Sequence, residues 1–466
     1  MKADLQTVQT QINRFAILSV MVDGGYRFWD DRNQKLFSPA GDKMKRRNMQ
    51  SLSRFFVMVC ALSMFGVQAM AQTPTASLTD WTQWRGADRD GVLKNASPWP
   101  NSLSTKRLVE SWRVPLGSSY SGPLVVGQHV FVTETVNESD EYVRCFDRST
   151  AKEIWSANWQ GAMKVPFFAA SNGSWIRSTP AYSNGRIFVG GIRDVLVCLD
   201  AATGDELWRR DFPAEMNSPA PQFGCVCSPL VDGEHVYMQA GGAMHKLDQA
   251  TGKTLWQSCK DGSGKNSSVF SSPAIETVGG ERQLIVQGRT ELAGVDLDTG
   301  AKLWAAPIPA FRGMSIITPT VFNDQFFISN YQHPSMMLSV SRSGSNFSIS
   351  EKWKIKTRGY MTTPVVVDGM AYTFLQNQRF ACIDLRTGKE NWVSEKFGKY
   401  ASLISNGDQV LALTSAGELV LFKANSDRFE MIDRRAVGTN SWAHLAVSDD
   451  EVFVRNLNEL LVFKWK

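Results

Sequence analysis

The sequence predicts an all-β fold, a β-propeller of eight four-stranded antiparallel blades that is closed by an N-terminal strand completing the last blade. Three observations support this prediction. A segment ending in Trp recurs every 39 to 53 residues between Trp112 and Trp392, each interval carries the signals of four short strands, and the 466 residues include 15 Trp and 36 Gly. A seven-bladed ring is the alternative, because the copies at 342–353 and 423–434 are eroded and an eighth is placed only near Arg435.

Residues 44–71 have the three features of a secretory signal peptide. Lys45, Arg46, Arg47 and Arg54 form a basic start, 55–67 is a short apolar run, and small residues at 69 and 71 suit cleavage after Ala71. An N-terminal membrane anchor or a buried helix is the alternative. We expect a periplasmic or extracellular protein with no transmembrane segment after cleavage. Residues 1–43 resemble neither a leader nor a domain, so we predict a disordered, over-extended start, with Met1 and Met44 both open as the first residue.

The charge of the chain argues against a nucleic-acid partner. The formal net charge is +5, but residues 72–466 carry 40 basic and 40 acidic side chains. No run of Lys and Arg follows the leader, so the mature chain has no stretch that would track phosphates. The hydrophobic fraction of 43% supplies a large core and argues against long disorder.

The propeller is predicted to span 108–466, preceded by an extension at 72–107 that packs on it. Each repeat has a Ser/Thr-Pro step before a short apolar strand, a turn, an alternating strand, and two strands joined at Asp-x-x-Thr-Gly. The chain ends on 459–466, which matches a third strand, whereas 108–112 is a fourth strand without a blade. We predict that these two segments pair and close the ring.

The repeated residues have structural roles. The Trp side chains are predicted to wedge against the neighbouring blade, and the Asp and Gly residues to form the turn between the last two strands. The predicted wedges are Trp112, Trp155, Trp208, Trp256, Trp304, Trp353 and Trp392. The predicted turn residues are Asp200, Gly204, Asp248, Gly252, Asp296, Gly300, Asp384 and Gly388.

The signature Asp-x-x-Thr-Gly-x-x-x-Trp resembles the pyrroloquinoline-quinone (PQQ) repeat, a module of eight-bladed propellers. Residues 81–91 also resemble the N-terminal stretch of secreted, planctomycete-type members. The resemblance implies two activities: quinoprotein dehydrogenases that use PQQ with calcium, and an outer-membrane β-barrel assembly lipoprotein that binds proteins. The dehydrogenases resemble one another in a disulfide between adjacent cysteines and in carboxylate ligands to calcium. This chain has no Cys-Cys pair, and Cys225-Val-Cys227 is its nearest approach.

The other cysteines and the histidines point to no metal site. Cys145, Cys198 and Cys382 occupy one repeat position and read as small buried hydrophobes. The disulfide state of Cys225, Cys227 and Cys259 stays open. The five histidines form no close pair, so no zinc site is expected.

Residues just before the first strand of each blade are predicted to rim the central channel. This position gathers Trp175, Arg177, Tyr360, Tyr400, Trp442 and His444, which are our candidate binding residues. The alternative is that these aromatic side chains only fill the channel.

We therefore expect a monomeric, non-catalytic binding or scaffold protein whose rim contacts a protein or polysaccharide partner, with no cofactor. The alternative is a PQQ- and calcium-dependent alcohol or sugar dehydrogenase. A hydrolase or lyase using rim residues is a third hypothesis. No catalytic residue can be assigned from the sequence.

Overall fold

The computed structural model describes residues 19–22, 25–30, 35–37, 73–94, 96–261 and 269–466. The chain divides into two units, 1–70 and 71–466. In the first, β1 (Ser19–Val22), β2 (Gly25–Asp30) and β3 (Lys35–Phe37) form an antiparallel sheet. The predicted signal peptide at 44–71 lies outside the described residues. That residues 1–43 are an over-extended, disordered start also stays a prediction.

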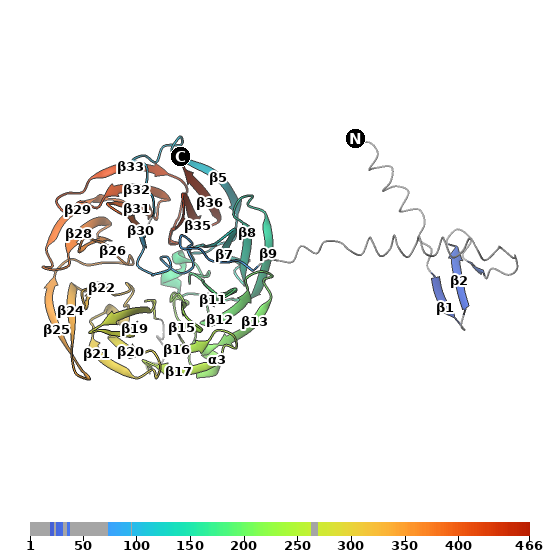
Figure 1. Cartoon of the computed structure of the whole chain (residues 1–466), viewed down its shortest axis with the longest axis horizontal. Helices are drawn as coiled ribbons and strands as arrows, with labels where there is room; N and C mark the ends of the chain where they lie inside the picture. Colours follow the sequence, from blue (N-terminus) through green and yellow to red (C-terminus); the bar gives the residue numbers. More distant parts are fainter. Residues whose placement is uncertain (1–18, 23–24, 31–34, 38–72, 95, 262–268) are drawn as a thin grey trace. The chain divides into compact units, whose positions relative to one another are not determined.

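The described strands of the second unit form eight antiparallel blades around a central axis (Figure 1), which confirms the predicted ring. Blades 1 to 4 are β6 (Leu124–Val126), β7 (His129–Val136), β8 (Asp140–Asp147), β9 (Glu153–Gln160); β10 (Ala181–Ser183), β11 (Arg186–Gly191), β12 (Val195–Asp200), β13 (Glu206–Asp211); β14 (Leu230–Asp232), β15 (His235–Ala240), β16 (Ala243–Asp248), β17 (Thr254–Ser258); and β18 (Ala274–Val278), β19 (Glu281–Gln287), β20 (Glu291–Asp296), β21 (Lys302–Pro307).

Blades 5 to 8 follow in the same order from the axis outward. They are β22 (Thr320–Phe322), β23 (Gln325–Ile328), β24 (Ser335–Ser343), β25 (Asn346–Ile355); β26 (Val365–Val367), β27 (Met370–Phe374), β28 (Arg379–Asp384), β29 (Glu390–Lys396); β30 (Ala401–Asn406), β31 (Gln409–Thr414), β32 (Glu418–Lys423), β33 (Met431–Ala436); and β34 (Ala446–Ser448), β35 (Glu451–Asn456), β36 (Glu459–Trp465), β5 (Leu108–Pro115).

The ring closes through strands from the two ends of the propeller. β5 pairs antiparallel with β36, with Trp112 opposite Val462, as the sequence predicts. A short strand of the extension, β4 (Val92–Leu93), pairs in parallel with β30 and gives blade 7 a fifth strand. The closed ring leaves neither terminal blade with an unpaired edge at these strands.

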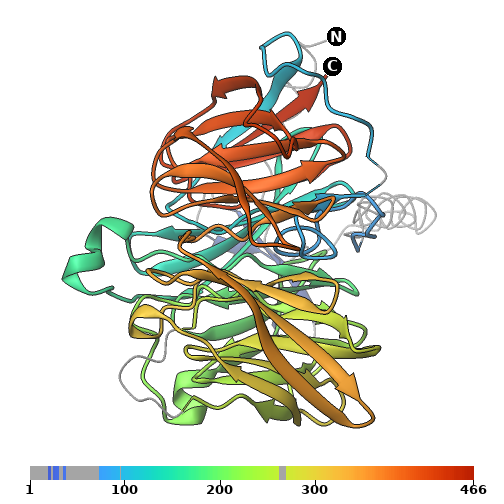
Figure 2. The same cartoon turned by 90° about the vertical axis from the view of Figure 1, so that its left-hand side faces the viewer.

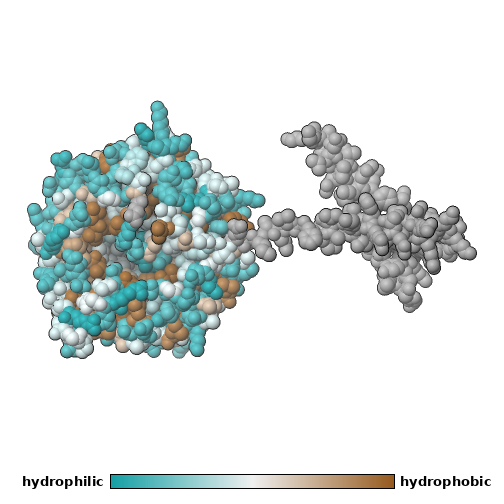
Figure 3. All heavy atoms as spheres, in the orientation of Figure 1, coloured by the Kyte–Doolittle hydropathy of each residue, from teal (hydrophilic) through white to brown (hydrophobic). Residues whose placement is uncertain are grey.

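The middle strands of the blades are buried on both faces. In β31 every residue from Gln409 to Thr414 is buried, and the run Val410-Leu411-Ala412-Leu413 is continuous rather than alternating. Such runs arise because each blade packs between two neighbouring blades. The core therefore lies between blades, and Figure 3 shows hydrophilic residues over most of the outer circumference.

The repeated Trp side chains join consecutive blades. In six of the seven, Nε1 donates a hydrogen bond to the carbonyl oxygen that follows the turn Asp, or its equivalent, in the next blade. The pairs are Trp112 to Arg148, Trp155 to Ala201, Trp208 to Gln249, Trp256 to Leu297, Trp353 to Leu385 and Trp392 to Asn425, at 2.7 to 3.1 Å. These six indoles thereby link each blade to the backbone of the next.

In the Asp-x-x-Thr-Gly turns the Gly lies against the Trp of the preceding blade. Oδ1 of Asp200 accepts from the backbone N–H groups of Ala202 and Thr203 at 2.8 and 3.0 Å. Gly300 has φ +73°, and a Cβ there would lie 2.7 Å from the Trp256 ring. Glycine is required at this position both for its left-handed backbone and for the space that the Trp occupies.

A register shift lies between the third and fourth strands of every described blade, next to the Trp position. In blade 3, Lys246 pairs with Trp256 and Leu247 with Thr254, which leaves Leu255 as the extra residue. Such a bulge re-aims the side chain beside it. Leu255 is consequently turned outward and is 48% exposed.

Two blades depart from the pattern. Blade 5 lacks the Asp-x-x-Thr-Gly turn. The Trp of the preceding blade 4, Trp304, therefore donates instead to Oε1 of the buried Gln283, which also belongs to blade 4, at 2.7 Å. In blade 7 the Trp position is Asp433, opposite Leu421, which agrees with the eighth segment predicted near Arg435. Asp433 accepts from the N–H of Leu103 at 2.7 Å, because the extension replaces the missing wedge there.

A one-turn helix, α3 (Phe212–Met216), follows blade 2 and covers His245 of blade 3. The ring centroids of Phe212 and His245 lie 4.4 Å apart, and the imidazole is fully buried. Nε2 lies 3.1 Å from the carbonyl oxygen of Ala240 and donates to it, whereas Nδ1 has no partner among the described residues. Burial lowers the pKa of His245 to about 4.

No helix in the described part of the chain is long and apolar enough to cross a bilayer.

His245 predicts acid sensitivity. A depressed folded-state pKa means that the unfolded chain binds more protons between about pH 6.5 and pH 4, so stability is lost as the pH falls through that window. In His245→Gln the amide can still donate to Ala240 but does not titrate. Between pH 7 and pH 4 we therefore expect the free energy of unfolding of this variant to fall by about 3 kcal/mol less than that of the wild type. Urea unfolding at both pH values measures it, and parallel losses in the two proteins would contradict the assignment.

Candidate functional site

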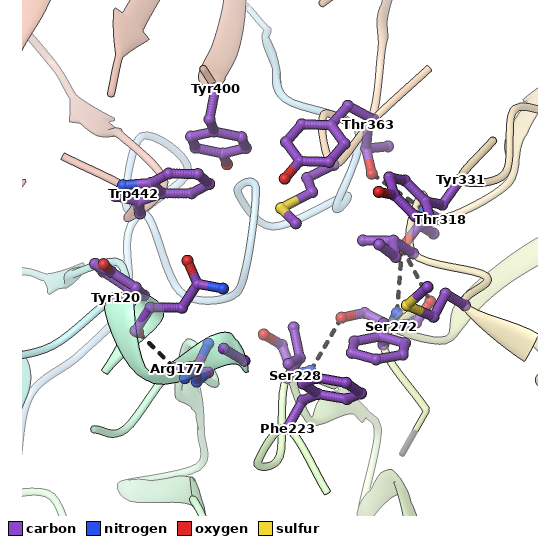
Figure 4. A pocket seen from close by; sticks show the side chains of 18 of the residues that line it. Tyr120, Arg177, Phe223, Ser228, Ser272, Thr318, Tyr331, Thr363, Tyr400 and Trp442 are labelled. Carbon is purple, nitrogen blue, oxygen red and sulfur yellow. Dashed lines mark hydrogen bonds between the residues drawn. The ribbon is translucent and has the colours of Figure 1, made fainter. Parts of the chain in front are cut away.

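A belt of hydroxyl groups surrounds the channel where the first strands begin. Each Ser or Thr before a Pro accepts a hydrogen bond from the N–H of the equivalent residue in the preceding blade. The accepting residues, named here the hydroxyl belt, are Thr179, Ser228, Ser272, Thr318 and Thr363, at 2.9 to 3.2 Å. Figure 4 shows part of this belt as a row from Ser228 to Thr318. The belt fixes the inner ends of blades 1 to 6 relative to one another.

The extension closes the channel from one side. Its backbone and side chains step around the ring: Trp81 pairs with Val125 of blade 1, the carbonyl of Thr82 accepts from Tyr182 of blade 2, and Oε1 of Gln83 accepts from Val231 of blade 3. Residues 81–91 are named the plug below. In Figure 2, segment 73–94 (blue) lies on the side of the ring opposite the projecting loop at about 165–175 (green).

Two arginines anchor the plug to the belt. Arg85 donates to the carbonyl oxygens of Thr363 and Pro364 at 2.8 and 2.6 Å. Arg89 donates to the carbonyl oxygens of Ser228, Pro229 and Pro273 at 2.8 to 3.1 Å. The two guanidinium groups thereby bridge blades 3, 4 and 6.

Trp84 lies between these two cations. Their guanidinium carbons are 5.6 Å (Arg85) and 5.3 Å (Arg89) from the centroid of the Trp84 ring, a cation–π distance. Burial lowers the pKa of Arg85 to about 10 and that of Arg89 to about 9. Both stay protonated at neutral pH. Backbone carbonyl oxygens bind both guanidinium groups, and the nearby Asp90 carboxylate additionally stabilises the charge of Arg85.

On the far side of Trp84 the channel opens into a cavity of about 610 Å³. Five of the six predicted rim residues line it: Arg177, Tyr360, Tyr400, Trp442 and His444. Trp175 stands behind them and meets the edge of the Tyr120 ring at 5.4 Å. The position before the first strand therefore does face the channel, while the binding role of these residues stays a prediction.

Part of this aromatic set packs rather than projects. The Tyr400 and Trp442 rings are stacked at 5.3 Å and 6° (Figure 4), and His444 meets the Trp84 ring edge-on at 5.4 Å. Burial, with the nearby Arg85 charge, lowers the pKa of His444 to about 3. His444 is therefore neutral at physiological pH and forms part of the floor of the cavity.

Phenylalanine side chains stand exposed around the mouth. Phe167 and Phe168 are 91% and 62% exposed on the short 3₁₀ helix η1 (Phe167–Asn172), and Phe311 is 38% exposed on η3 (Phe311–Gly313). Phe168 contacts Phe223, whose ring centroid is 6.1 Å away, and both residues line the cavity. Sequence reasoning missed the phenylalanines of these loops because the loops lie outside the repeat.

The plug was missed as well. The sequence places Trp84, Arg85 and Arg89 only in a stretch that resembles other propellers, with no position in space. A signal was available: two Arg within a few residues of Trp84, in a segment of extension with no strand pattern. Arginine is the side chain best suited to bond several carbonyl oxygens at once.

The cavity lacks the groups that a calcium-bound quinone would need. None of its described lining residues carries a carboxylate, and the described part of the chain has no cluster of potential metal ligands. Cys225 and Cys227 are free and buried. Calcium is normally held by six to eight oxygen ligands with carboxylates among them, and the described lining residues supply no carboxylate, so they are a poor fit to PQQ with calcium.

Known proteins are similar to this chain. The family model described as outer membrane protein assembly factor BamB matches residues 139–394. BamB of Yersinia pestis is 24% identical over 383 residues, 78% of this chain and 81% of its own length. A quinohemoprotein alcohol dehydrogenase, ADH IIB of Pseudomonas putida, is 26% identical over 168 residues, 34% of this chain and 24% of its own.

The fold is shared with solved structures. BamB from Moraxella catarrhalis matches with a TM-score of 0.55 and 15% identity, over 77% of this chain and 100% of that one. At this identity the likeness concerns the ring of blades and not its surface.

Proposed function

The chain belongs to the family of the outer membrane protein assembly factor BamB, and on that premise we propose that it is a non-catalytic scaffold of the bacterial periplasm. Its partner is a protein, bound at the open end of the channel. The predicted leader at 44–71 and the outer-membrane proteins among its relatives support this location. The observation that carries the binding site is the exposed aromatic mouth of a cavity that the plug closes from behind.

Exposed phenylalanines favour a macromolecular partner. Phe167 and Phe168 project beyond the cavity, and burying such side chains supplies much of the affinity of protein interfaces. Each would contribute about 2–3 kcal/mol of transfer free energy if fully covered.

The chemistry of the cavity favours binding over catalysis. Its ionisable lining groups are arginines, tyrosines and the neutral His444. Burial raises the pKa of Tyr360 and Tyr400 above that of free tyrosine, so neither is poised as a base near neutral pH. The described lining residues thus supply no carboxylate for acid–base work and no activated nucleophile.

Photo-crosslinking tests the proposal. With benzoylphenylalanine in place of Phe168 or Phe311 in native cells, we expect one envelope protein to be captured, about tenfold more than from the controls. The controls replace Ile154 and Leu207, which are 44% and 45% exposed on the outer strands β9 and β13. Mass spectrometry of the adducts identifies the partner.

Two outcomes would contradict this function. Equal capture from the outer strands would show that the mouth is not the binding surface. Saturable micromolar binding of PQQ in the presence of Ca²⁺, with dye-linked alcohol oxidation, would instead establish a dehydrogenase. Binding at the outer strands and PQQ-dependent oxidation do not need the exposed phenylalanines. Phe168→Ser should therefore weaken partner capture only if the scaffold binds at the mouth of the cavity.

A further inference from the structure

The wall of the cavity holds a cation with no acidic partner. Nη2 of Arg177 donates to the backbone carbonyl oxygens of Asn172, at 3.3 Å, and Gly173. Its Nε is buried without an acceptor, and it forms no ion pair with any described residue. Tyr120, whose ring centroid is 5.8 Å from the guanidinium carbon, is its aromatic neighbour. Arg177 is half-buried, and its Nε is out of reach of water and of any described acceptor. A cation in this position can gain an anion from outside as its partner.

The surrounding charges reinforce this. The other cationic side chains of the lining are Arg289 and Arg312. Arg289 lies 3.9 Å from the carboxylate of Asp261, which is not part of the lining. Arg312 is exposed at the mouth, 5.2 Å over the Phe311 ring. Because no described lining residue is acidic, the cavity has a positive potential that low-dielectric walls concentrate.

Aromatic rings share the cavity with this cation. Tyr120, the aromatic neighbour of Arg177, contacts the rings of Trp175 and Trp442 at centroid distances of 5.4 and 5.8 Å. Phe168 and Phe223 also line the cavity, with their ring centroids 6.1 Å apart. An occupant that satisfies Arg177 therefore has aromatic surface available to its neighbouring groups.

We propose that the cavity receives an Asp or Glu side chain from an extended segment of the partner, with its carboxylate on Arg177 and bulky apolar neighbours on the Tyr120 and Phe223 sides. This rests on the proposed scaffold function and names the partner's chemistry. A polysaccharide fits less well, because sugars need many side-chain acceptors. The hydroxyls of the belt already accept backbone hydrogen bonds, and Asn172 and Gln222 are the amides among the described lining residues.

Peptide selection tests this chemistry without knowledge of the partner. Random dodecapeptides displayed on phage are selected on the immobilised mature protein and, in parallel, on Arg177→Gln. We expect the wild type to enrich Asp or Glu next to Phe, Trp or Leu, and the variant to lose that enrichment. A control, Arg434→Gln, changes an exposed arginine of β33 and should select as the wild type does.

A double-mutant cycle makes the pairing quantitative. For the most enriched peptide, we expect Arg177→Gln and replacement of the acid by its amide each to weaken binding about tenfold, with little further loss together. Arg177→Lys should recover part of the affinity, which a folding defect would not allow. Fluorescence anisotropy of the labelled peptide measures all four constants.

The possible failures are distinguishable. Neutral aromatic peptides that bind as well as acidic ones, with loss on Phe168→Ser, would overturn the acidic pairing and leave the scaffold function standing. Arg177-dependent binding of tetragalacturonate, with no peptide selected, would overturn both and assign an acidic polysaccharide. Acidic peptides that bind equally to Arg177→Gln would remove Arg177 from the site.

Discussion

Trp256→Ala is expected to lower the free energy of unfolding by about 3–5 kcal/mol. The ring is 9% exposed and covers Gly300 of the next blade, and its Nε1 donates to the carbonyl oxygen of Leu297 at 3.1 Å. Alanine would leave a cavity between blades 3 and 4 and an interior carbonyl without its donor. Urea unfolding followed by circular dichroism measures the loss.

A glycine pair separates the wedge contact from backbone strain. Gly300 and Gly280 of blade 4 have φ of +73° and +77°, but a Cβ would meet the Trp256 ring only at Gly300 and nothing within 4 Å at Gly280. Gly280→Ala should cost about 1 kcal/mol from its backbone alone. Gly300→Ala should cost at least twice that, and equal costs would show that the Trp does not press on the turn.

Arg89→Met is expected to release the plug and to lower the free energy of unfolding by about 3–5 kcal/mol. The substitution removes a buried cation together with three hydrogen bonds to Ser228, Pro229 and Pro273. Arg89→Lys keeps the charge but cannot reach three carbonyl oxygens from one atom, so we expect it to lose most of the same stability. Denaturant titration compares the two variants.

Limited proteolysis shows whether the loss is local. In Arg89→Met we expect trypsin to cut within 73–107 well before it cuts any blade, with the fragments identified by mass spectrometry. Arg209→Met, at a partly exposed arginine paired with Glu206 on β13, is the control and should leave the extension protected. Protection of 73–107 in Arg89→Met would show that the hydrogen bonds of Arg89 do not hold the plug in place.

The repeat made most of the fold predictable. Trp256, Gly300 and Asp296 recur in a fixed frame, so their partners in the next blade follow from the period alone. Where the frame is eroded, prediction fails for a physical reason. Asp433 replaces a Trp because Leu103 of the extension, distant in sequence, occupies that interface, and no local pattern reports such a contact.

The candidate site divides in the same way. Arg177 and Tyr360 precede the Pro of their blades, and this position could be read from the alignment of the repeats. Phe167 and Phe168 could not, because they lie in an insertion whose sequence obeys no period. The spacing of 53 residues between Trp155 and Trp208, the widest in the chain, was the available sign of that insertion.

The pairing of β5 with β36 has a consequence for synthesis. β5, the strand that finishes blade 8, is synthesised before blade 1, whereas its partner β36 is synthesised after blade 7. A chain that lacks β36 leaves β5 without its hydrogen-bonding partner, so the ring of blades cannot close. Blade 8 therefore cannot be completed before β36 has been synthesised, and a chain that stops short of β36 would be left with an open ring.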